Sequence, residues 1–312
     1  MPAKAGIQWA APGDPMTLQT RLAGGTFVIT AEVTPPLSAS ADALLARAAP
    51  LAGLVDAINV TDAAGARPAM SSFAAAAILA REGLEPVLQI TCRDRNRIAL
   101  AGDLLGAAAQ GIENLLVLHG DDPATGDMPD AKPVYDLDSR GVMALARDMS
   151  ENGTLPSGRA IEPPPKFFIG CADTPLDPPA DWAPEGLEGK IAAGARFAQM
   201  QFCFDPALAR RYFARLRQAG ITERLSFIVG IGPLLSVRQA RYMHDNLFGV
   251  SVPDALFERL EAARDERAEG LAICTELIGE LASIEGVAGV HFMAPAQSPQ
   301  AIADAIRAAA LR

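Results

Sequence analysis

The sequence predicts a (β/α)₈ barrel of the TIM-barrel type, built as one domain over residues 1–312. Two observations lead to this class. Short apolar runs alternate eight times with longer amphipathic runs rich in Ala, Leu and Arg, and half of all residues are hydrophobic. Strands separated by helices pair in parallel, and parallel strands buried on both faces are nearly continuous apolar runs. An open doubly wound sheet is the alternative, but the first strand-to-helix turn lacks its G-x-G-x-x-G fingerprint.

Each strand candidate is followed by a helical pattern, as the barrel requires. The eight candidates are "TFVITAEV", "VDAINV", "EPVLQITC", "ENLLVLHG", "KFFIGC", "FAQMQFCF", "LSFIVGI" and "VAGVHFM". The helices are predicted to begin near Ser40, Ser71, Asp94, Ser139, Glu185, Pro206, Ser236 and Pro299.

Three segments depart from a minimal barrel. Residues 1–22 are predicted to be an N-terminal tail. The Gly- and Pro-rich connection over residues 150–165 is expected to be a surface loop at the end of the barrel far from the site. Residues 250–285 are predicted to insert about two extra helices before the last strand, for packing or for contacts between subunits.

Composition excludes several classes of partner. The net charge of −10 and the absence of a Lys/Arg cluster argue against nucleic acid or an anionic membrane surface. No apolar run is long enough to span a bilayer, and the first twenty residues lack the apolar core of a secretory signal. The four cysteines form no C-x-x-C pair, which suits buried thiols in a reducing compartment. We expect a cytoplasmic protein that binds small molecules or other proteins.

Polar residues gather where the predicted strands end. In a (β/α)₈ barrel the loops after the strands' C-termini build the active site. The residues at these ends are Glu32, residues 59–65, Gln89 and Thr91, residues 119–123, and residues 201–205.

Glu32 stands near the end of the apolar stretch "FVITAEVTPP", which two prolines terminate. An isolated glutamate often only caps a loop. A carboxyl at a mouth lined by Phe27, Phe202, Phe204 or Phe292 would have a raised pKa, because desolvation disfavours its charged form. Glu32 is therefore a candidate general acid.

Asp121 and Asp122 follow Gly120 at a strand-to-helix turn. They are either turn-forming residues or a fixed negative charge that stabilises a cationic intermediate or adjusts the redox potential of a bound ring. The Pro- and Asp-rich loop over residues 121–141 is a candidate lid or binding loop. Gln201 is either a core amide or a donor and acceptor for the edge of a heteroaromatic ring.

The histidines do not indicate a metal site. His119 and His291 stand near strand ends, but the chain has three histidines in total and no H-x-x-E motif or carboxylate cluster beside them. We expect no metal.

Six motifs, in order along the chain, resemble those of methylenetetrahydrofolate reductases, in the form of a short bacterial member. They are "AEVTPP", "NVTDAAGARPAMSS", "PVLQITCRDRNR", "LLVLHGDDP", "KIAAGARFAQMQFCFD" and "VGIGPLLSVRQARYM". The resemblance extends from about Thr26 to the C-terminus.

The resemblance implies a flavin barrel, normally with FAD, that takes hydride from NADH or NADPH and reduces 5,10-methylenetetrahydrofolate to 5-methyltetrahydrofolate. By the same resemblance Glu32 is the general acid that protonates N10, and Asp121 stabilises the resulting 5-iminium cation. Gln201 would bind the pterin, with Phe204 of the same motif on the substrate side. The implied cofactor-binding residues are Thr61, Asp62, Gln89, Thr91, His119, Gly120, Asp121 and Lys190.

Several positions depart from the family pattern. Asp62 replaces a Tyr, Gln89 replaces a His, and Gly186 and Gly189 stand where an Asn and an Arg are expected. A pyrophosphate needs cationic or N–H partners, and fewer are present. FMN in place of FAD, weak flavin binding, and a partner subunit that supplies electrons therefore stay open.

Two alternative functions follow from the same features. One is a folate- or corrinoid-handling subunit without redox activity of its own, which the loss of flavin-binding groups suggests. The other is a different flavin barrel, similar to proline dehydrogenase, but no cationic clamp for an amino-acid carboxylate is evident. Besides its small-molecule ligands, the protein is expected to have a second copy of itself or a partner subunit as a possible partner.

Overall fold

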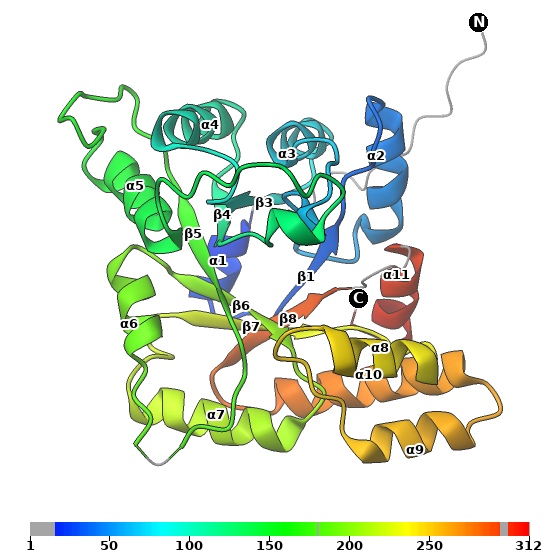
Figure 1. The fold of residues 1–312 in the computed structure, drawn as a ribbon. Helices are drawn as coiled ribbons and strands as arrows, with labels where there is room; N and C mark the ends of the chain where they lie inside the picture. The colour runs from blue at the N-terminus through cyan, green and yellow to red at the C-terminus, as the bar shows by residue number, and fades with distance from the viewer. Residues whose placement is uncertain (1–15, 180, 294–298, 312) are drawn as a thin grey trace, which may run out of the picture.

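Eight parallel strands close into a barrel in chain order, with β8 hydrogen-bonded to β1 (Figure 1). The computed structural model describes residues 16–179, 181–293 and 299–311. The predicted TIM barrel is confirmed, and all eight predicted strands form. The strands are β1 (Val28–Val33), β2 (Ala57–Val60), β3 (Pro86–Thr91), β4 (Asn114–Leu118), β5 (Phe168–Asp173), β6 (Phe197–Phe202), β7 (Ser226–Ile231) and β8 (Val287–Phe292).

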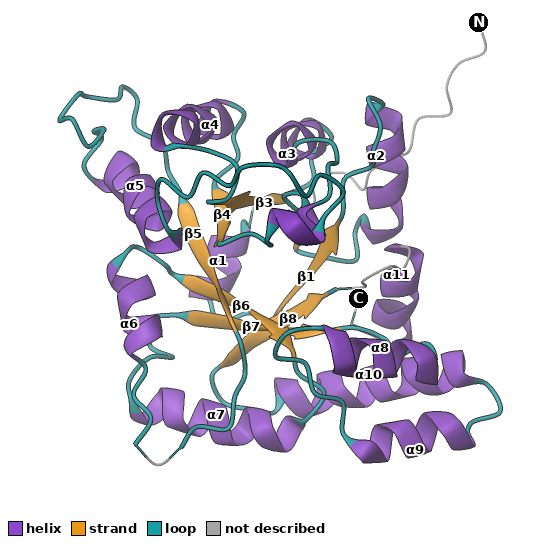
Figure 2. Ribbon diagram, in the orientation of Figure 1, coloured by secondary structure: helices purple, strands orange, loops and turns teal. Residues whose placement is uncertain are grey.

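Helices surround the strands on the outside (Figure 2). Three predicted helix starts fall on N-caps: the hydroxyls of Ser40, Ser71 and Ser236 each accept from the backbone N–H three residues later. The helix predicted to begin near Asp94 begins at Arg97 instead, because Asn96 is its N-cap. The ring consists of α2 (Ala41–Ala48), α3 (Ser72–Arg81), α4 (Arg97–Ala109), α5 (Ser139–Glu151), α6 (Glu185–Ala192), α7 (Pro206–Gln218), α10 (Glu266–Ala282) and α11 (Pro299–Ala308).

Part of the predicted N-terminal tail is structured. Residues Leu18–Ala23 form helix α1, capped by the Thr17 hydroxyl. Leu18 and Leu22 are buried against the lowest layer of the barrel interior, and the Leu18 N–H donates to Glu85 Oε1 at 2.7 Å. Burying two leucines stabilises the fold by about 3 kcal/mol or more, which explains why this segment folds onto the barrel. Residues 1–15 lie outside the described chain.

The barrel interior changes from apolar to polar along its axis. At the bottom the rings of Phe168 and Phe197 stack with centroids 4.9 Å apart. Gly170 leaves room for this pair, since a Cβ there would lie 2.3 Å from the Phe197 ring. The next layer consists of Thr30, Asn59, Gln199 and His291, all buried. Because strand side chains alternate between faces, residues two positions further along point into the mouth.

Three helices lie between β7 and β8: α8 (Val237–Asn246), α9 (Asp254–Ala262) and α10. The predicted extra helices are confirmed. Helix α10 packs against β8, α7 and α11 and so belongs to the ring, although it lies within the segment 250–285. Of these three helices, α8 and α9 therefore lie outside the ring. They enclose a small separate core that includes Phe202, Phe204 and Phe257.

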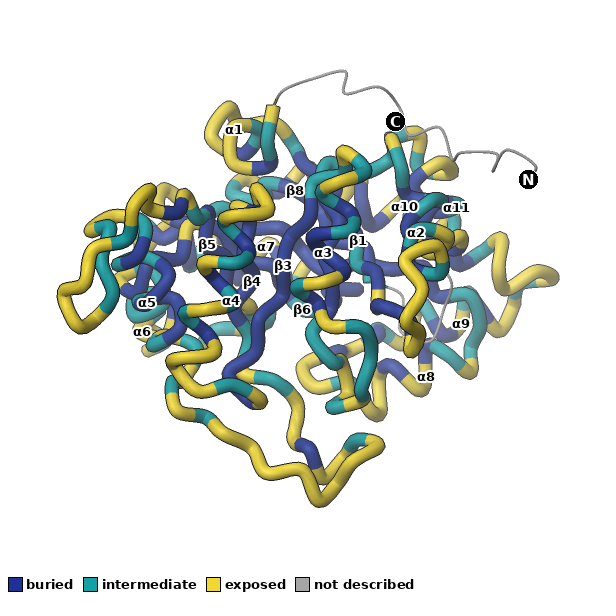
Figure 3. Tube along the Cα trace, turned by 90° about the horizontal axis from the view of Figure 1, so that it is seen from above, coloured by how far each residue is buried: buried dark blue, intermediate teal, exposed yellow. Residues whose placement is uncertain are grey.

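The connections at the two ends differ in form. The loop over residues 150–165 precedes β5 and so lies at the N-terminal end of the strands, where an isolated bridge joins Thr154 and Ala160. Figure 3 shows the strands buried and the outer loops exposed.

All four cysteines are buried and free. Among the described helices none is both long and apolar enough to cross a membrane.

Candidate functional site

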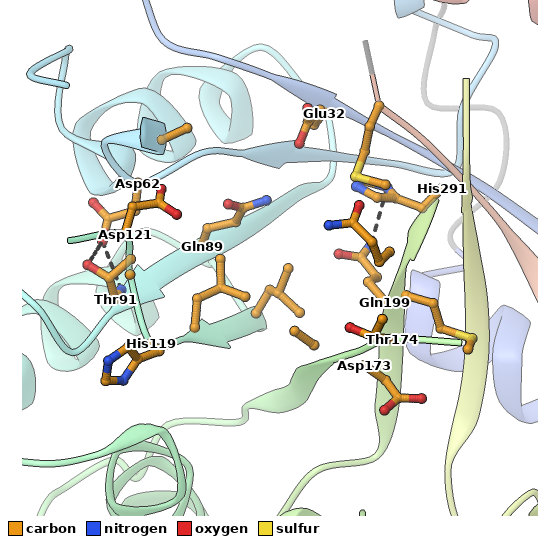
Figure 4. A pocket seen from close by; sticks show the side chains of 18 of the residues that line it. Glu32, Asp62, Gln89, Thr91, His119, Asp121, Asp173, Thr174, Gln199 and His291 are labelled. Carbon is orange, nitrogen blue, oxygen red and sulfur yellow. Dashed lines mark hydrogen bonds between the residues drawn. The ribbon is translucent and has the colours of Figure 1, made fainter. Parts of the chain in front are cut away.

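A pocket of about 530 Å³ opens at the carboxyl ends of the strands, where the barrel fold places active sites. Figure 4 shows Asp62, Thr91, His119 and Asp121 on one side and Gln199 and His291 on the other. Eight predicted site residues line the pocket: Glu32, Asp62, Gln89, Thr91, His119, Gly120, Asp121 and Gln201. Three predicted residues do not line it: Thr61, Lys190 and Phe204.

Glu32 is held on the interior face of β1, and its carboxyl has no hydrogen-bond or ion-pair partner among the described residues. Burial raises its pKa to about 7. The phenylalanines expected around it do not line the pocket: Phe27 and Phe292 face the outer core, and Phe202 and Phe204 face the core under α8 and α9. The apolar residues that line the pocket with Glu32 are instead Leu116, Leu118, Met200 and Met293. A carboxyl with this pKa holds and releases a proton near neutrality.

Asp121 joins two loops at the mouth. Its Oδ2 accepts from the Gly65 N–H at 2.7 Å, so the loop after β4 is tied to the loop after β2. Gly126 further along this loop packs directly on the Ala66 carbonyl. Gly120 has φ +94°, and a Cβ there would lie 3.0 Å from Arg93 Cβ, so glycine is required before Asp121.

Asp62 and Thr91 are hydrogen-bonded to each other. Asp62 Oδ2 accepts from the Thr91 N–H at 2.8 Å and from its hydroxyl at 2.9 Å, and it is ion-paired with Arg95. Asp62 Oδ1 accepts from the Ser72 hydroxyl at 3.1 Å. These bonds use the lone pairs of Asp62, so its contribution is to hold the ends of β2 and β3 together.

Lys190 lies behind the pocket wall. Its Nζ donates to the Ala172 carbonyl at 2.7 Å, which holds the end of β5. The neighbouring Asp173 accepts from the Tyr212 hydroxyl at 2.9 Å, and Figure 4 shows its carboxylate turned away from Glu32. Burial raises the pKa of Asp173 to about 6, against the lowering effect of Lys190. Lys190 therefore supports β5 and does not face a ligand in the pocket.

Two other predicted residues also differ from expectation. Phe204 is buried and stacked on Phe202, with centroids 5.6 Å apart, because strand alternation carries it into the core under α8 and α9. Thr61 is buried on the interior face, and its hydroxyl has no partner among the described residues.

Gln201 and Phe248 form the rim on the opposite side. Gln201 Nε2 donates to the Phe248 carbonyl at 3.1 Å, which fixes the loop between α8 and α9 at the mouth. In the same loop Gly249 has φ +73° and lies against the Thr174 methyl group. Phe248 lines the pocket and is 86% exposed. An exposed ring at a pocket mouth is suited to stack on a planar ligand.

The long loop after β4 is also held beyond Gly126. The Val134 N–H donates to the Arg93 carbonyl at 2.7 Å. The Tyr135 ring stacks on His119, with centroids 4.6 Å apart and planes 8° from parallel. The predicted binding loop therefore reaches the pocket through His119.

The polar layer beneath the pocket was missed in the sequence. Asn59 and Gln199 exchange hydrogen bonds between their amides, and Gln199 Nε2 also donates to Thr30 Oγ1 at 3.2 Å. Burial lowers the pKa of His291 to about 3, so it is neutral. Strand alternation could have identified the layer, because Thr30 shares the face of Glu32 and Gln199 shares the face of Gln201.

The charge of the lining decides which cofactors fit. The ionisable carboxyls at the pocket are those of Glu32, Asp62, Asp121 and Asp173, and no Lys or Arg is among the described lining residues. The nearby Arg93 and Arg95 are paired with Asp94 and Asp62. A pyrophosphate needs cationic or free N–H partners, and the Gly65 N–H is already given to Asp121. The lining therefore does not fit the pyrophosphate of FAD. The described residues contain no His/Cys/Asp/Glu group that could hold a metal ion.

Fold and site together define a TIM-barrel protein with an acidic ligand pocket and a protonatable carboxyl at the C-terminal ends of its strands. The profile of the family described as "Methylenetetrahydrofolate reductase" matches residues 17–306. The chain belongs to this family.

Individual relatives are distant. The chain is 29% identical over 220 residues to the 5,10-methylenetetrahydrofolate reductase of Salmonella typhimurium, covering 68% of this chain and 66% of that protein. It is 25% identical over 229 residues to a probable methylenetetrahydrofolate reductase (NADPH) of Caenorhabditis elegans, covering 71% of this chain but 32% of that protein. The match thus spans about a third of the nematode protein and about two thirds of the bacterial one.

Among solved structures, an uncharacterised protein from Clostridium thermocellum, described as binding two copies of 5-methyl-5,6,7,8-tetrahydrofolic acid, superposes with a TM-score of 0.61. The identity is 12%, and the match covers 94% of this chain and 97% of that one. At this identity the likeness concerns the fold.

Proposed function

We propose that the protein reduces 5,10-methylenetetrahydrofolate to 5-methyltetrahydrofolate with hydride derived from NADH or NADPH, and that Glu32 is the general acid. Membership of the reductase family supports the reaction. The observation on which the proposal depends is the Glu32 carboxyl, which stands without a partner in the pocket and has a pKa raised to about 7.

The residues suit the proton and charge changes of this reaction. Breaking the bond between N10 and the bridging carbon requires a proton at N10, which Glu32 supplies, and leaves a 5-iminium cation. Hydride addition to the bridging carbon then gives the 5-methyl group. The Asp121 carboxylate, held by the Gly65 N–H, adds negative charge that favours the cation.

The rim residues are proposed to hold the folate. Phe248 stands on one side of the mouth, where its carbonyl is held by the Gln201 amide, and Gln89 stands on β3 with no bonded partner among the described residues. The Clostridium thermocellum protein described as binding 5-methyltetrahydrofolic acid shares the fold, which supports folate as the ligand class.

The proposal includes no flavin step, because the acidic lining does not fit the FAD pyrophosphate. The implied cofactor-binding roles of Thr61, Asp62, Thr91 and Lys190 are not proposed, since these side chains are either outside the pocket or already bonded. FMN, weakly held FAD and a partner subunit are tested as electron sources below.

A second candidate is a folate-binding subunit without redox activity of its own. The observation that favours it is the absence of Lys and Arg from the described pocket lining, since both FAD and the nicotinamide nucleotides contain a pyrophosphate. Such a protein would bind 5-methyltetrahydrofolate and would need another chain for the reduction.

Turnover by the purified protein separates the two candidates. Anaerobic reactions contain methylenetetrahydrofolate with NADH or NADPH, each with no flavin, with FMN or with FAD, and 5-methyltetrahydrofolate is quantified. Product in any arm supports the reductase, and the productive arm identifies the electron source. Binding of 5-methyltetrahydrofolate with no product in any arm supports the folate-binding subunit instead.

A further inference from the structure

We propose that His291 is a neutral hydrogen-bond donor in the pocket, and that its Nε2–H binds a conjugated carbonyl oxygen of a heteroaromatic ligand beside Glu32. Given the proposed function, that oxygen belongs either to the pterin ring of the folate or to the carboxamide of the nicotinamide. The inference therefore deepens the proposed function by assigning a recognition residue.

The hydrogen bonds beneath the pocket assign the tautomer of His291. With the amides oriented as they are in the structure, Gln199 Nε2 donates to Asn59 Oδ1 at 3.0 Å and to Thr30 Oγ1 at 3.2 Å. Thr30 Oγ1 lies 2.9 Å from His291 Nδ1. Gln199 Nε2, which can only donate, also lies 3.5 Å from His291 Nδ1, so Nδ1 is the acceptor of this group and the Thr30 O–H donates to it. The proton of the neutral ring is then on Nε2.

No described residue bonds to the Nε2 of His291, whose side chain is 2% exposed. His291 lines the pocket, so this nitrogen is available to a ligand. Figure 4 shows the ring on the pocket wall with its contact to Gln199.

The His291 ring remains neutral in this role as a hydrogen-bond donor. Burial lowers the pKa of His291 to about 3, so the ring stays uncharged at any pH at which the protein works. A neutral N–H can bind an uncharged carbonyl oxygen without adding a positive charge to the pocket.

The register of the barrel places His291 next to Glu32. Thr30 pairs with His291 across β1 and β8, and Glu32 lies two residues further toward the mouth on the same face as Thr30. Two residues of a strand span about 7 Å. A planar ring bound against this wall can therefore meet the His291 N–H with one edge and Glu32 with the next.

Few side chains that line the pocket have a hydrogen-bond donor free for a ligand. Its carboxylates accept hydrogen bonds, the Thr91 hydroxyl donates to Asp62, and the Gln201 amide donates to Phe248. Of the described lining side chains, His291, His119 and Gln89 have N–H donors without a protein acceptor, and of these His291 is the one that pairs with the strand of Glu32. A pterin or nicotinamide ring has carbonyl oxygens as well as N–H groups, so its recognition requires both kinds of partner.

The first test is the tautomer in the free protein. Nitrogen-15 correlation spectra of the imidazole side chains are recorded for wild type and for His291→Phe, which assigns the His291 signals by their loss. We expect a protonated Nε2 and an unprotonated Nδ1 that do not change between pH 5 and 8, with a downfield shift of the Nε2 proton on ligand binding. A protonated Nδ1, or titration within this range, would overturn the proposal.

The second test is affinity, measured separately with 5-methyltetrahydrofolate and with NADH. His291→Phe retains a ring but no donor and is expected to weaken one of the two ligands about tenfold, which identifies the source of the carbonyl. Thr30→Ser keeps the hydroxyl and should bind both ligands as wild type does. A folded His291→Phe protein, verified by its thermal melt, that binds both ligands with wild-type affinity would refute the assignment. Failure of the wild-type protein itself to bind folate would instead refute the proposed function.

Discussion

Asp121 Oδ2 accepts a 2.7 Å hydrogen bond from the Gly65 N–H, which joins the loops after β4 and β2 at the mouth of the barrel. Asp121 therefore has two roles: it holds the two loops together, and it places a negative charge in the pocket. Asp121→Asn separates the two, because an amide oxygen can still accept from Gly65. We expect turnover to fall by roughly 10- to 100-fold with folate affinity and thermal stability nearly unchanged.

The matched control for this variant is Asp122→Asn. Asp122 is the next residue, but it is exposed, caps a short 3₁₀ turn and lies outside the pocket lining. It should turn over at the wild-type rate. Equal losses in the two variants would mean that the loop, and not the charge of Asp121, sets the rate.

The buried carboxyl of Glu32 predicts a pH-dependent stability. Its pKa is raised from 4.5 to about 7 in the folded protein, so the folded state binds a proton more tightly than the unfolded state. The contribution, about 3 kcal/mol, is fully present below about pH 4.5 and is lost as the pH rises from there through 7. Glu32→Gln removes it.

Urea unfolding of both proteins at about pH 5 and pH 8 measures this difference. The free energy of unfolding should fall more from pH 5 to pH 8 in wild type than in Glu32→Gln. A smaller decline should persist in the variant, since the pKa of Asp173 is also raised, to about 6. Parallel pH profiles for the two proteins would show that Glu32 ionises normally.

Gly120 is expected to tolerate no side chain. An alanine would place a Cβ 3.0 Å from Arg93 Cβ and 3.1 Å from Thr91 Cβ at a φ of +94°. Gly120→Ala should therefore lower the free energy of unfolding by about 1–3 kcal/mol. Gly102→Ala is the control: Gly102 lies in α4 with no atom within 4 Å of the added Cβ, and it should gain about 0.5–1 kcal/mol. Differential scanning calorimetry compares the two, and a stable Gly120→Ala would contradict the packing at this turn.

Phe248 is expected to affect binding without affecting stability. Its ring is 86% exposed at the pocket rim, so Phe248→Ala loses little packing but removes the stacking surface. Affinity for 5-methyltetrahydrofolate should fall about three- to tenfold. Tyr242→Ala, an exposed aromatic on α8 outside the lining, should bind normally. Fluorescence titration checks both, and equal affinities for Phe248→Ala and wild type would remove the ring from the site.

The sequence predicts the fold well because the barrel depends on local patterns. Buried parallel strands are apolar throughout, and serines such as Ser40 mark the helix starts one residue away. Helix α1 was missed since six residues show little periodicity, and its burial depends on the distant Glu85.

The site was predicted less completely, because a residue's position at a strand end does not say where its side chain points. Glu32 and Asp121 reach the pocket as expected. Phe204 turns to the core under α8 and α9, and Lys190 bonds to the Ala172 carbonyl. The His291 network joins β1, β2, β6 and β8, and its partners are up to 261 positions apart in the chain, beyond any local pattern.

The most direct test of the central claim compares Glu32→Gln with Glu113→Gln, an exposed glutamate at the opposite end of the barrel, for anaerobic formation of 5-methyltetrahydrofolate. The claim predicts that Glu32→Gln binds the folate with near wild-type affinity but loses roughly 10²- to 10⁴-fold in turnover, while Glu113→Gln is unaffected. Normal turnover by Glu32→Gln would contradict the assignment of Glu32 as the general acid.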